Sequence, residues 1–74
     1  MGLYDWEMKF YHELLALTGV HEVQTEYDEY SEILTVTVDG DFGYAYEPAD
    51  PDQIRTKFLQ IARDCPYTTK LVMR

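Results

Sequence analysis

The sequence has a single cysteine, no long apolar run and, through its middle, no positive charge. One cysteine, Cys65, excludes an internal disulfide and a cysteine-rich metal site, and it suits a reducing compartment. The longest stretch without charge or strong polarity covers residues 14–20, far short of the ~20 residues that span a membrane. Asp5 and Glu7 stand where an export signal carries positive charge. We expect a soluble, cytoplasmic protein that does not contact membranes.

The motifs of catalytic and metal sites are also missing. His12-Glu13 begins like the helical motif of zinc proteases, but Ala16 stands where that motif requires a second His. Residues 39–41 (DGD) lack the further acids and the closing Glu of a calcium loop, and a turn explains both Asp residues. No Gly-rich phosphate loop is present, and 74 residues give little depth for a substrate cleft. We therefore expect no catalytic residues, no metal, no cofactor and no enzymatic activity.

Two segments have the periodicity of amphipathic helices. Over residues 3–18 apolar side chains recur at steps of three and four, and Gly19 follows where a left-handed residue ends a helix. Over residues 51–64 the same spacing follows Asp50, a suitable N-cap, with Pro at the first helical position. The expected core residues of the protein are Trp6, Phe10, Leu14, Leu34, Val36, Ile54, Phe58 and Ile61.

Between these helices the pattern changes to the period of two that is typical of strands. Residues 20–27 alternate with one polar face, and residues 32–38 are rich in β-branched side chains. Asp39-Gly40 is a strong signal for a two-residue hairpin, so a third strand is expected over residues 42–47. Residues 68–74 fit either a short fourth strand or a loose tail, and we favour the strand.

The order of these elements predicts the fold class. We expect one α+β domain spanning residues 1–74, small and without linkers, in the order α-β-β-β-α-β. Its two helices should pack on one face of a mainly antiparallel sheet, because hairpin-connected strands run antiparallel and the other sheet face carries polar residues.

The direction of three aromatic side chains, Phe42, Tyr44 and Tyr46, depends on the length of the predicted hairpin loop. A two-residue loop would place them on the sheet face away from the helices, as an open aromatic platform. A loop with an odd number of residues changes the parity and turns them into the core. We favour the second register, because it separates polar from apolar side chains more cleanly and a small domain must bury its large side chains.

Negative charge is concentrated in one part of the chain. The net charge is −8, and residues 20–53 contain ten acids but no Lys or Arg. Such a surface repels DNA and RNA, so no direct contact with nucleic acid is expected. Three explanations stay open: internal pairing with Arg55, Lys57 and Arg63, pairing between copies in a homo-oligomer, or a foreign basic protein as partner.

A foreign basic partner leads to a specific functional hypothesis. Carboxylates on one side of a strand repeat every ~6.8 Å, comparable to two phosphate rises of ~3.4 Å along a DNA strand. The sequence thus predicts a non-enzymatic inhibitor or modulator that mimics nucleic acid, as a phage anti-defence protein would, and blocks a nucleic-acid-binding protein. The alternative is a small structural or assembly subunit that uses the aromatic platform. The expected partner-binding residues are Glu22, Glu26, Tyr27, Asp28, Glu29, Tyr30, Glu32, Asp39, Asp41 and Glu47.

Overall fold

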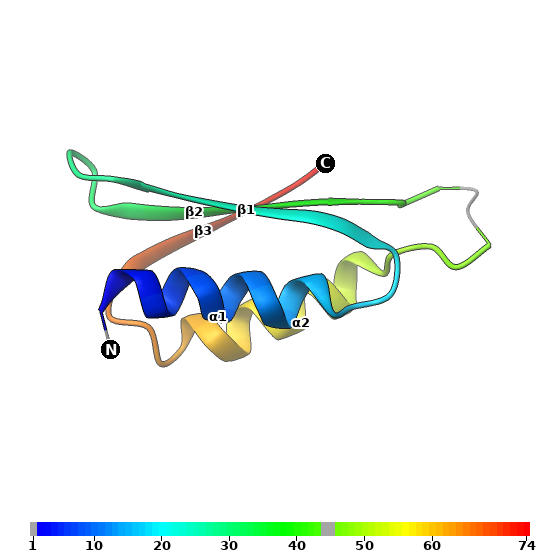
Figure 1. Cartoon of the computed structure of the whole chain (residues 1–74), viewed down its shortest axis with the longest axis horizontal. Helices are drawn as coiled ribbons and strands as arrows, with labels where there is room; N and C mark the ends of the chain where they lie inside the picture. Colours follow the sequence, from blue (N-terminus) through cyan, green and yellow to red (C-terminus); the bar gives the residue numbers. More distant parts are fainter. Residues whose placement is uncertain (1, 44–45) are drawn as a thin grey trace.

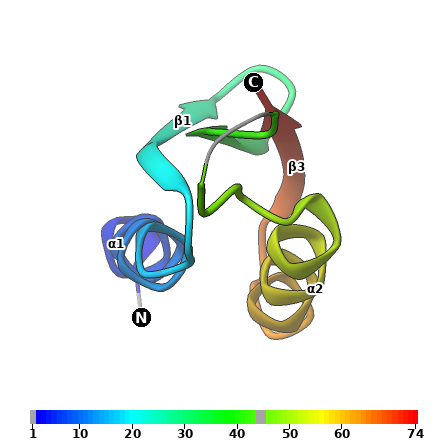
Figure 2. The ribbon, with the colours of Figure 1, turned by 90° about the vertical axis from the view of Figure 1, so that its right-hand side faces the viewer.

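A computed structural model describes residues 2–43 and 46–74, which form a layer of two helices against a layer of three strands (Figure 1). Both helices cover the same face of the sheet, with α1 below β1 and α2 below β3 (Figure 2). The elements are α1 (Leu3–Leu15), β1 (Val20–Asp28), β2 (Ile33–Gly40), α2 (Pro51–Ala62) and β3 (Thr68–Met73). The α+β class and the placement of both helices on one face are confirmed.

The sheet has the strand order β1-β2-β3, with β2 in the centre. β2 runs antiparallel to β1 and parallel to β3. The sheet is therefore mixed, and the expectation of a mainly antiparallel sheet is wrong. The physical reason is the position of α2, which forms the crossover connection that a parallel pair of strands requires.

The third strand predicted over residues 42–47 is not found in the described part of that segment, where residues 41–43 and 46–50 belong to no strand. Asp39 and Gly40 do not form a hairpin turn but end β2, where Gly40 pairs with Val20 of β1. On its other edge β2 is already paired with β3. With both edges occupied, β2 has no edge left for a hairpin partner, so the chain after Gly40 becomes a long connection to α2.

Both placements considered for the three aromatic residues assumed that missing strand. Phe42 is half-buried and packs against the core, whereas Tyr46 is 99% exposed in the connection. Tyr44 lies outside the described residues. The residues that the structure describes therefore form neither the open aromatic platform nor the inward-facing aromatic strand.

The ends of both helices follow from the residues found there. α1 ends at Leu15, three residues earlier than predicted, with Ala16 as its C-cap; Gly19 is left-handed with a φ of 78°, but it lies in the following turn and does not cap the helix. At the start of α2 the Asp50 carboxylate accepts hydrogen bonds from the backbone N–H groups of Asp52 (2.9 Å) and Gln53 (3.4 Å). These bonds satisfy two of the backbone donors that a helix N-terminus leaves free.

The core lies between the helices and the sheet. All eight predicted core residues are buried, and Val23, Val38 and Ala49 join them. The rings of Phe10 on α1 and Phe58 on α2 lie 5.4 Å apart between centroids and connect the two helices. Since the buried residues of β2 alternate with half-exposed ones, the opposite face of the sheet points outward. That outward face carries all four acids of the strands.

Candidate protein-binding surface

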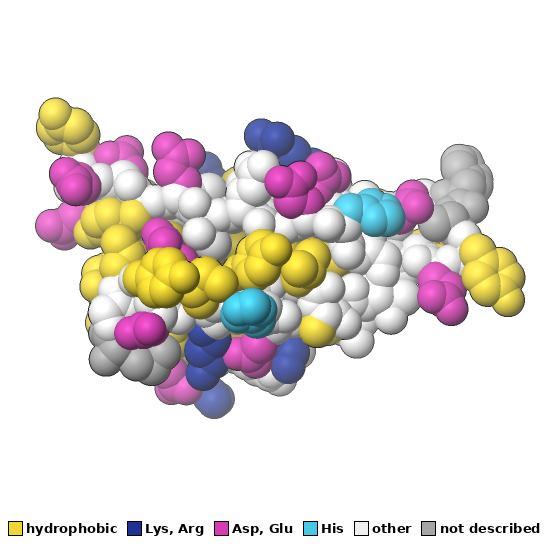
Figure 3. All heavy atoms as spheres, viewed as in Figure 1, with side chains coloured by type: hydrophobic (Ala, Val, Ile, Leu, Met, Phe, Trp, Pro, Cys, Tyr) yellow, Lys and Arg dark blue, Asp and Glu magenta, His cyan; other side chains and the backbone are white. Residues whose placement is uncertain are grey.

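Four carboxylates lie on the sheet face that the helices do not cover. Three of them lie on β1, on the side opposite to that of Val23, which is buried against the helices. The fourth lies on β2. The strand register places Glu22 opposite Asp39, and Glu26 opposite Thr35 of β2. In Figure 3 acidic side chains lie along the sheet and around its hairpin end. We define the acidic face as Glu22, Glu26, Asp28 and Asp39, all of which are exposed.

The turn between β1 and β2 continues this charge beyond the sheet. The Asp28 side chain accepts a hydrogen bond from the backbone N–H of Tyr30 (2.9 Å), and the Asp28 carbonyl accepts one from the N–H of Glu32 (2.7 Å). Glu32 has a φ of 58°, a left-handed conformation that closes the turn. The Tyr30 ring is fully exposed. Glu29, Tyr30 and Glu32 form the acidic hairpin tip, which adjoins the acidic face.

Tyr27, the remaining predicted binding residue of β1, points to the other face of the sheet. It is partly buried, and its ring meets that of Tyr67 edge-on, with centroids 5.6 Å apart. Burial, and to a smaller extent the charge of Glu32, raises the pKa of the Tyr27 hydroxyl above its ordinary value of 10.0. The contribution of the neutral hydroxyl to the free energy of unfolding is therefore complete below pH 10. It is lost as the pH rises through the raised pKa of the folded protein.

The last two predicted binding residues, Asp41 and Glu47, lie in the connection between β2 and α2. The protein extends 39 Å along its longest axis, and Figure 1 shows the hairpin tip and this connection at its two ends. Asp41 lies near His21, with 3.7 Å between its Oδ2 and the imidazole Nε2. The structure thus unites the acids of the acidic face and the hairpin tip, and it separates Glu47 from them.

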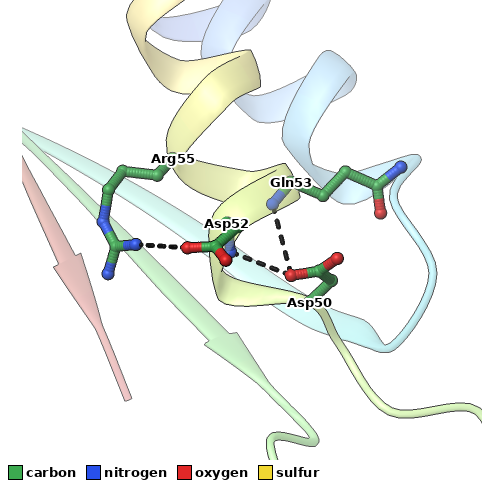
Figure 4. Close-up of polar contacts among 4 residues, drawn as sticks. All are labelled: Asp50, Asp52, Gln53 and Arg55. Atoms are coloured by element: carbon green, nitrogen blue, oxygen red, sulfur yellow. Dashed lines mark hydrogen bonds and ion pairs between the residues drawn. The ribbon is translucent and has the colours of Figure 1, made fainter.

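The bases of α2 pair with acids outside the acidic face. Arg55 binds Asp52 in the same helix (2.9 Å), beside the Asp50 cap (Figure 4). Lys57 reaches Glu13 of α1 at 4.0 Å. Over residues 2–43 and 46–74, no Lys or Arg forms an ion pair with the acidic face or the hairpin tip. Internal pairing with α2 therefore does not explain this group of acids.

Two bases share the outer sheet face, and the sequence patterns did not identify them: Lys70, and Arg74 just after β3, whose backbone bonds to Val38 and Gly40 on either side of Asp39. Lys70 of β3 is paired with Thr35, the same residue that Glu26 faces from the other side. Thr35 of β2 therefore lies between Lys70 on β3 and Glu26 on β1. The outer face is acidic on its β1 side, carries Thr35, Thr37 and Asp39 at its centre, and is basic on its β3 side at Lys70 and Arg74. The parallel pairing of β3 produces this arrangement, and no local pattern in the sequence indicates it.

We expect moderate salt to stabilise the protein. Glu22 and Asp39 form a like-charged pair directly opposite each other, and such a pair costs about 0.2–1 kcal/mol. Screening of this pair and its neighbours should raise the melting temperature, by roughly 4–8 °C for each kcal/mol recovered. Thermal melts at 20 and 200 mM NaCl would measure the change. A melting temperature that falls with salt would show instead that these acids are paired.

Other features offer less for binding. A shallow hollow of about 620 Å³ lies between the end of α1 and the start of α2, and its lining includes Leu17, Asp50 and Lys57. Within the described residues, no group of three or more His, Cys, Asp or Glu side chains is placed to hold a metal ion. None of the described helices has the length and apolar character needed to cross a membrane.

Comparison of the chain with known protein families, with curated proteins and with solved structures finds no match in any of the three. What the protein binds must therefore be inferred from the charge and shape of its own surface. On that surface, the acidic face and the adjoining hairpin tip together carry six exposed carboxylates.

Proposed function

We propose that the protein is a non-enzymatic acidic binding protein that docks on a basic surface of another protein, one that normally holds DNA or RNA. Docking would block or modulate that surface. The observation that carries this proposal is the set of carboxylates along β1 and around the hairpin tip, none of which forms an ion pair with a Lys or Arg of the described residues. A fold gains nothing from such repulsion, because mixed charges give the same solubility without it.

The spacing of these carboxylates suits a site shaped for phosphates. Glu26 and Asp28 are two residues apart on the same side of β1, a separation of ~6.8 Å in an extended strand. Successive phosphates of one DNA strand are ~3.4 Å apart along the axis, so such a step spans two of them. Arg and Lys side chains arranged for a phosphate backbone could therefore meet this row of carboxylates.

The area required is within the reach of a small protein. The accessible surface is 5019 Å², and a standard interface takes ~800 Å² from each partner, about a sixth of this total. The exposed Tyr30 at the hairpin tip adds a rigid aromatic side chain of the kind that is enriched in binding hot spots. Charge-steered docking of this kind should be fast and should weaken steeply with salt.

Charge reversal tests the proposal. Glu26→Lys combined with Glu29→Lys should abolish the capture of basic nucleic-acid-binding proteins from an extract of the native host at 50 mM NaCl. A matched control, Glu47→Lys with Asp64→Lys, changes the net charge equally but lies outside the acidic face and should retain the capture. The wild-type protein should lose these partners at 300 mM NaCl.

A different result would reject the acidic-mimic function. If a neutral partner is recovered at both salt concentrations and survives the Glu26 and Glu29 reversals, the protein is an assembly subunit that binds through other contacts. If the two double variants lose binding equally, only net charge matters and the acidic face is not a specific site.

A further inference from the structure

α1 carries a second row of apolar side chains in addition to the one that faces the core. Tyr4, Met8, Tyr11 and Leu15 follow one another at steps of four, three and four residues. Tyr4 is 70% exposed, and the other three are half-buried. Figure 3 shows hydrophobic side chains gathered along the side of α1 that faces the viewer. We call these four residues the α1 seam.

The α1 seam is not needed to attach α1 to the sheet. The buried residues of the helix are Trp6, Phe10 and Leu14. At 3.6 residues per turn, Met8 lies roughly 160° around the helix from Trp6. Tyr11 and Leu15 rest one side against the core and leave the rest of each side chain exposed. A surface helix of a small domain is usually polar on this side, so the seam is available to another molecule.

The spacing of the seam identifies the kind of element that would cover it. Steps of four, three and four are those of the d and a positions of a heptad, at which two helices pack side by side. The distance from Tyr4 to Leu15 along the helix is about 16 Å, or three turns, at 1.5 Å per residue. A single amphipathic helix of three to four turns has the length and the side-chain spacing to lie along it.

The charges around the seam indicate the charge of the helix that would bind there. On α1 itself the three acids Asp5, Glu7 and Glu13 outnumber the one base, Lys9. β1 contacts α1 and, within the described residues, has no partner strand on its outer edge; its Glu22 and Glu26 lie on the sheet face away from the helices, where long side chains that pass this edge would meet them. A second copy of this chain, with a net charge of −8, would bring the same acids against these. A helix rich in Lys and Arg would instead pair with them.

We propose that the α1 seam receives a cationic amphipathic helix of the partner protein, whose apolar side packs on Tyr4, Met8, Tyr11 and Leu15. The Lys and Arg residues of that helix lie toward the acids of α1 and β1. This inference rests on the proposed function, because it names the element through which a basic partner is held. The seam supplies an apolar contact, which salt does not weaken. The acidic face supplies electrostatic attraction, which salt screens.

A synthetic peptide can serve as the probe. We would titrate a fluorescently labelled 14-residue peptide of Leu and Lys, arranged as an amphipathic helix, and a scrambled peptide of the same composition. The amphipathic peptide should bind at least tenfold more tightly in fluorescence anisotropy, and this ratio should persist at 300 mM NaCl. Tyr4→Ser with Tyr11→Ser should reduce the ratio toward one. Leu59→Ser, at a 59% exposed apolar residue of α2, is the matched control and should preserve it.

The single variant Tyr4→Ser should fold normally, since the Tyr4 ring is mostly exposed. It should lower the ratio of the two peptide affinities and leave the melting temperature unchanged. Equal binding of the two peptides, or a ratio that Tyr4→Ser leaves unchanged, would overturn the inference. So would a wild-type dimer in sedimentation that Tyr4→Ser with Tyr11→Ser dissociates, because a second copy would then cover the seam.

The two proposals fail in different ways. Glu26→Lys with Glu29→Lys should weaken both peptides alike at 50 mM NaCl and leave their ratio unchanged. If the two peptides bind equally but the charge reversals at Glu26 and Glu29 still weaken binding, the seam proposal alone is rejected. Charge reversals that have no effect on either peptide or on capture from the host extract would reject the proposed function.

Discussion

Replacing Phe58 with Ala should lower the free energy of unfolding by about 3–5 kcal/mol, a large part of the stability of a small domain. The Phe58 side chain is 6% exposed, and its ring lies 5.4 Å from that of Phe10 between centroids. Truncation removes the contact between the two helices and leaves a cavity that the surrounding side chains cannot fill. Urea unfolding followed by far-UV circular dichroism would measure the loss.

The neighbouring residue provides the control for this experiment. Leu59 is 59% exposed on the outer side of α2, so Leu59→Ala should change the stability by no more than ~0.5 kcal/mol. If Phe58→Ala were as stable as the wild-type protein, the packing of α2 on α1 would be wrong.

Gly19→Ala should destabilise the protein by more than about 2 kcal/mol. Gly19 has a φ of 78°, a left-handed conformation in which a Cβ is strained. In addition, a Cβ at this position would collide with the backbone of Pro48 and Ala49, where the connection passes α1's end. Backbone atoms cannot rotate away as a side chain can, so the loop between α1 and β1 would have to shift. Thermal and urea unfolding would both report the change.

Gly43 is the matched control for this substitution, since a Cβ there meets no atom within 4 Å among the described residues beyond its chain neighbours. Gly43→Ala should leave the free energy of unfolding within ~0.5 kcal/mol of the wild-type value. A Gly19→Ala protein that unfolds at the wild-type midpoint would show that the connection does not pass close to Gly19.

Local patterns in the sequence predicted the elements that local interactions determine. The cap at Asp50 is formed by residues next to the start of α2, and the apolar spacing of α1 and α2 identified their buried sides. The missing third strand has the opposite cause. Asp39-Gly40 has the composition of a turn, but β2 continues through it because β1 and β3 pair with both of its edges. The position of β3 depends on a crossover that no short stretch of sequence encodes.

The same distinction applies to the candidate surface. Period-two alternation placed Glu22 and Glu26 correctly on one side of β1. The same alternation places Tyr27 on the other side of β1, where its ring contacts that of Tyr67 and lies apart from these acids. Lys70 was missed, because it reaches the outer face only through the pairing of β3 with β2. Side-chain parity is thus predictable within a strand, whereas neighbours across strands depend on the topology.

The central position of β2 also has a consequence for the kinetics of folding. Its pairing with β1 closes only the short turn after Asp28, whereas its pairing with β3 joins Ile33 to Thr68 across the whole of α2. Closing the longer loop costs more chain entropy before any contact repays it. The hairpin can therefore form quickly and repeatedly, and the encounter of residues 33–38 with residues 68–73 should limit the rate. Until that encounter, the strand that is the centre of the finished sheet is an exposed edge, open to pairing with the wrong chain.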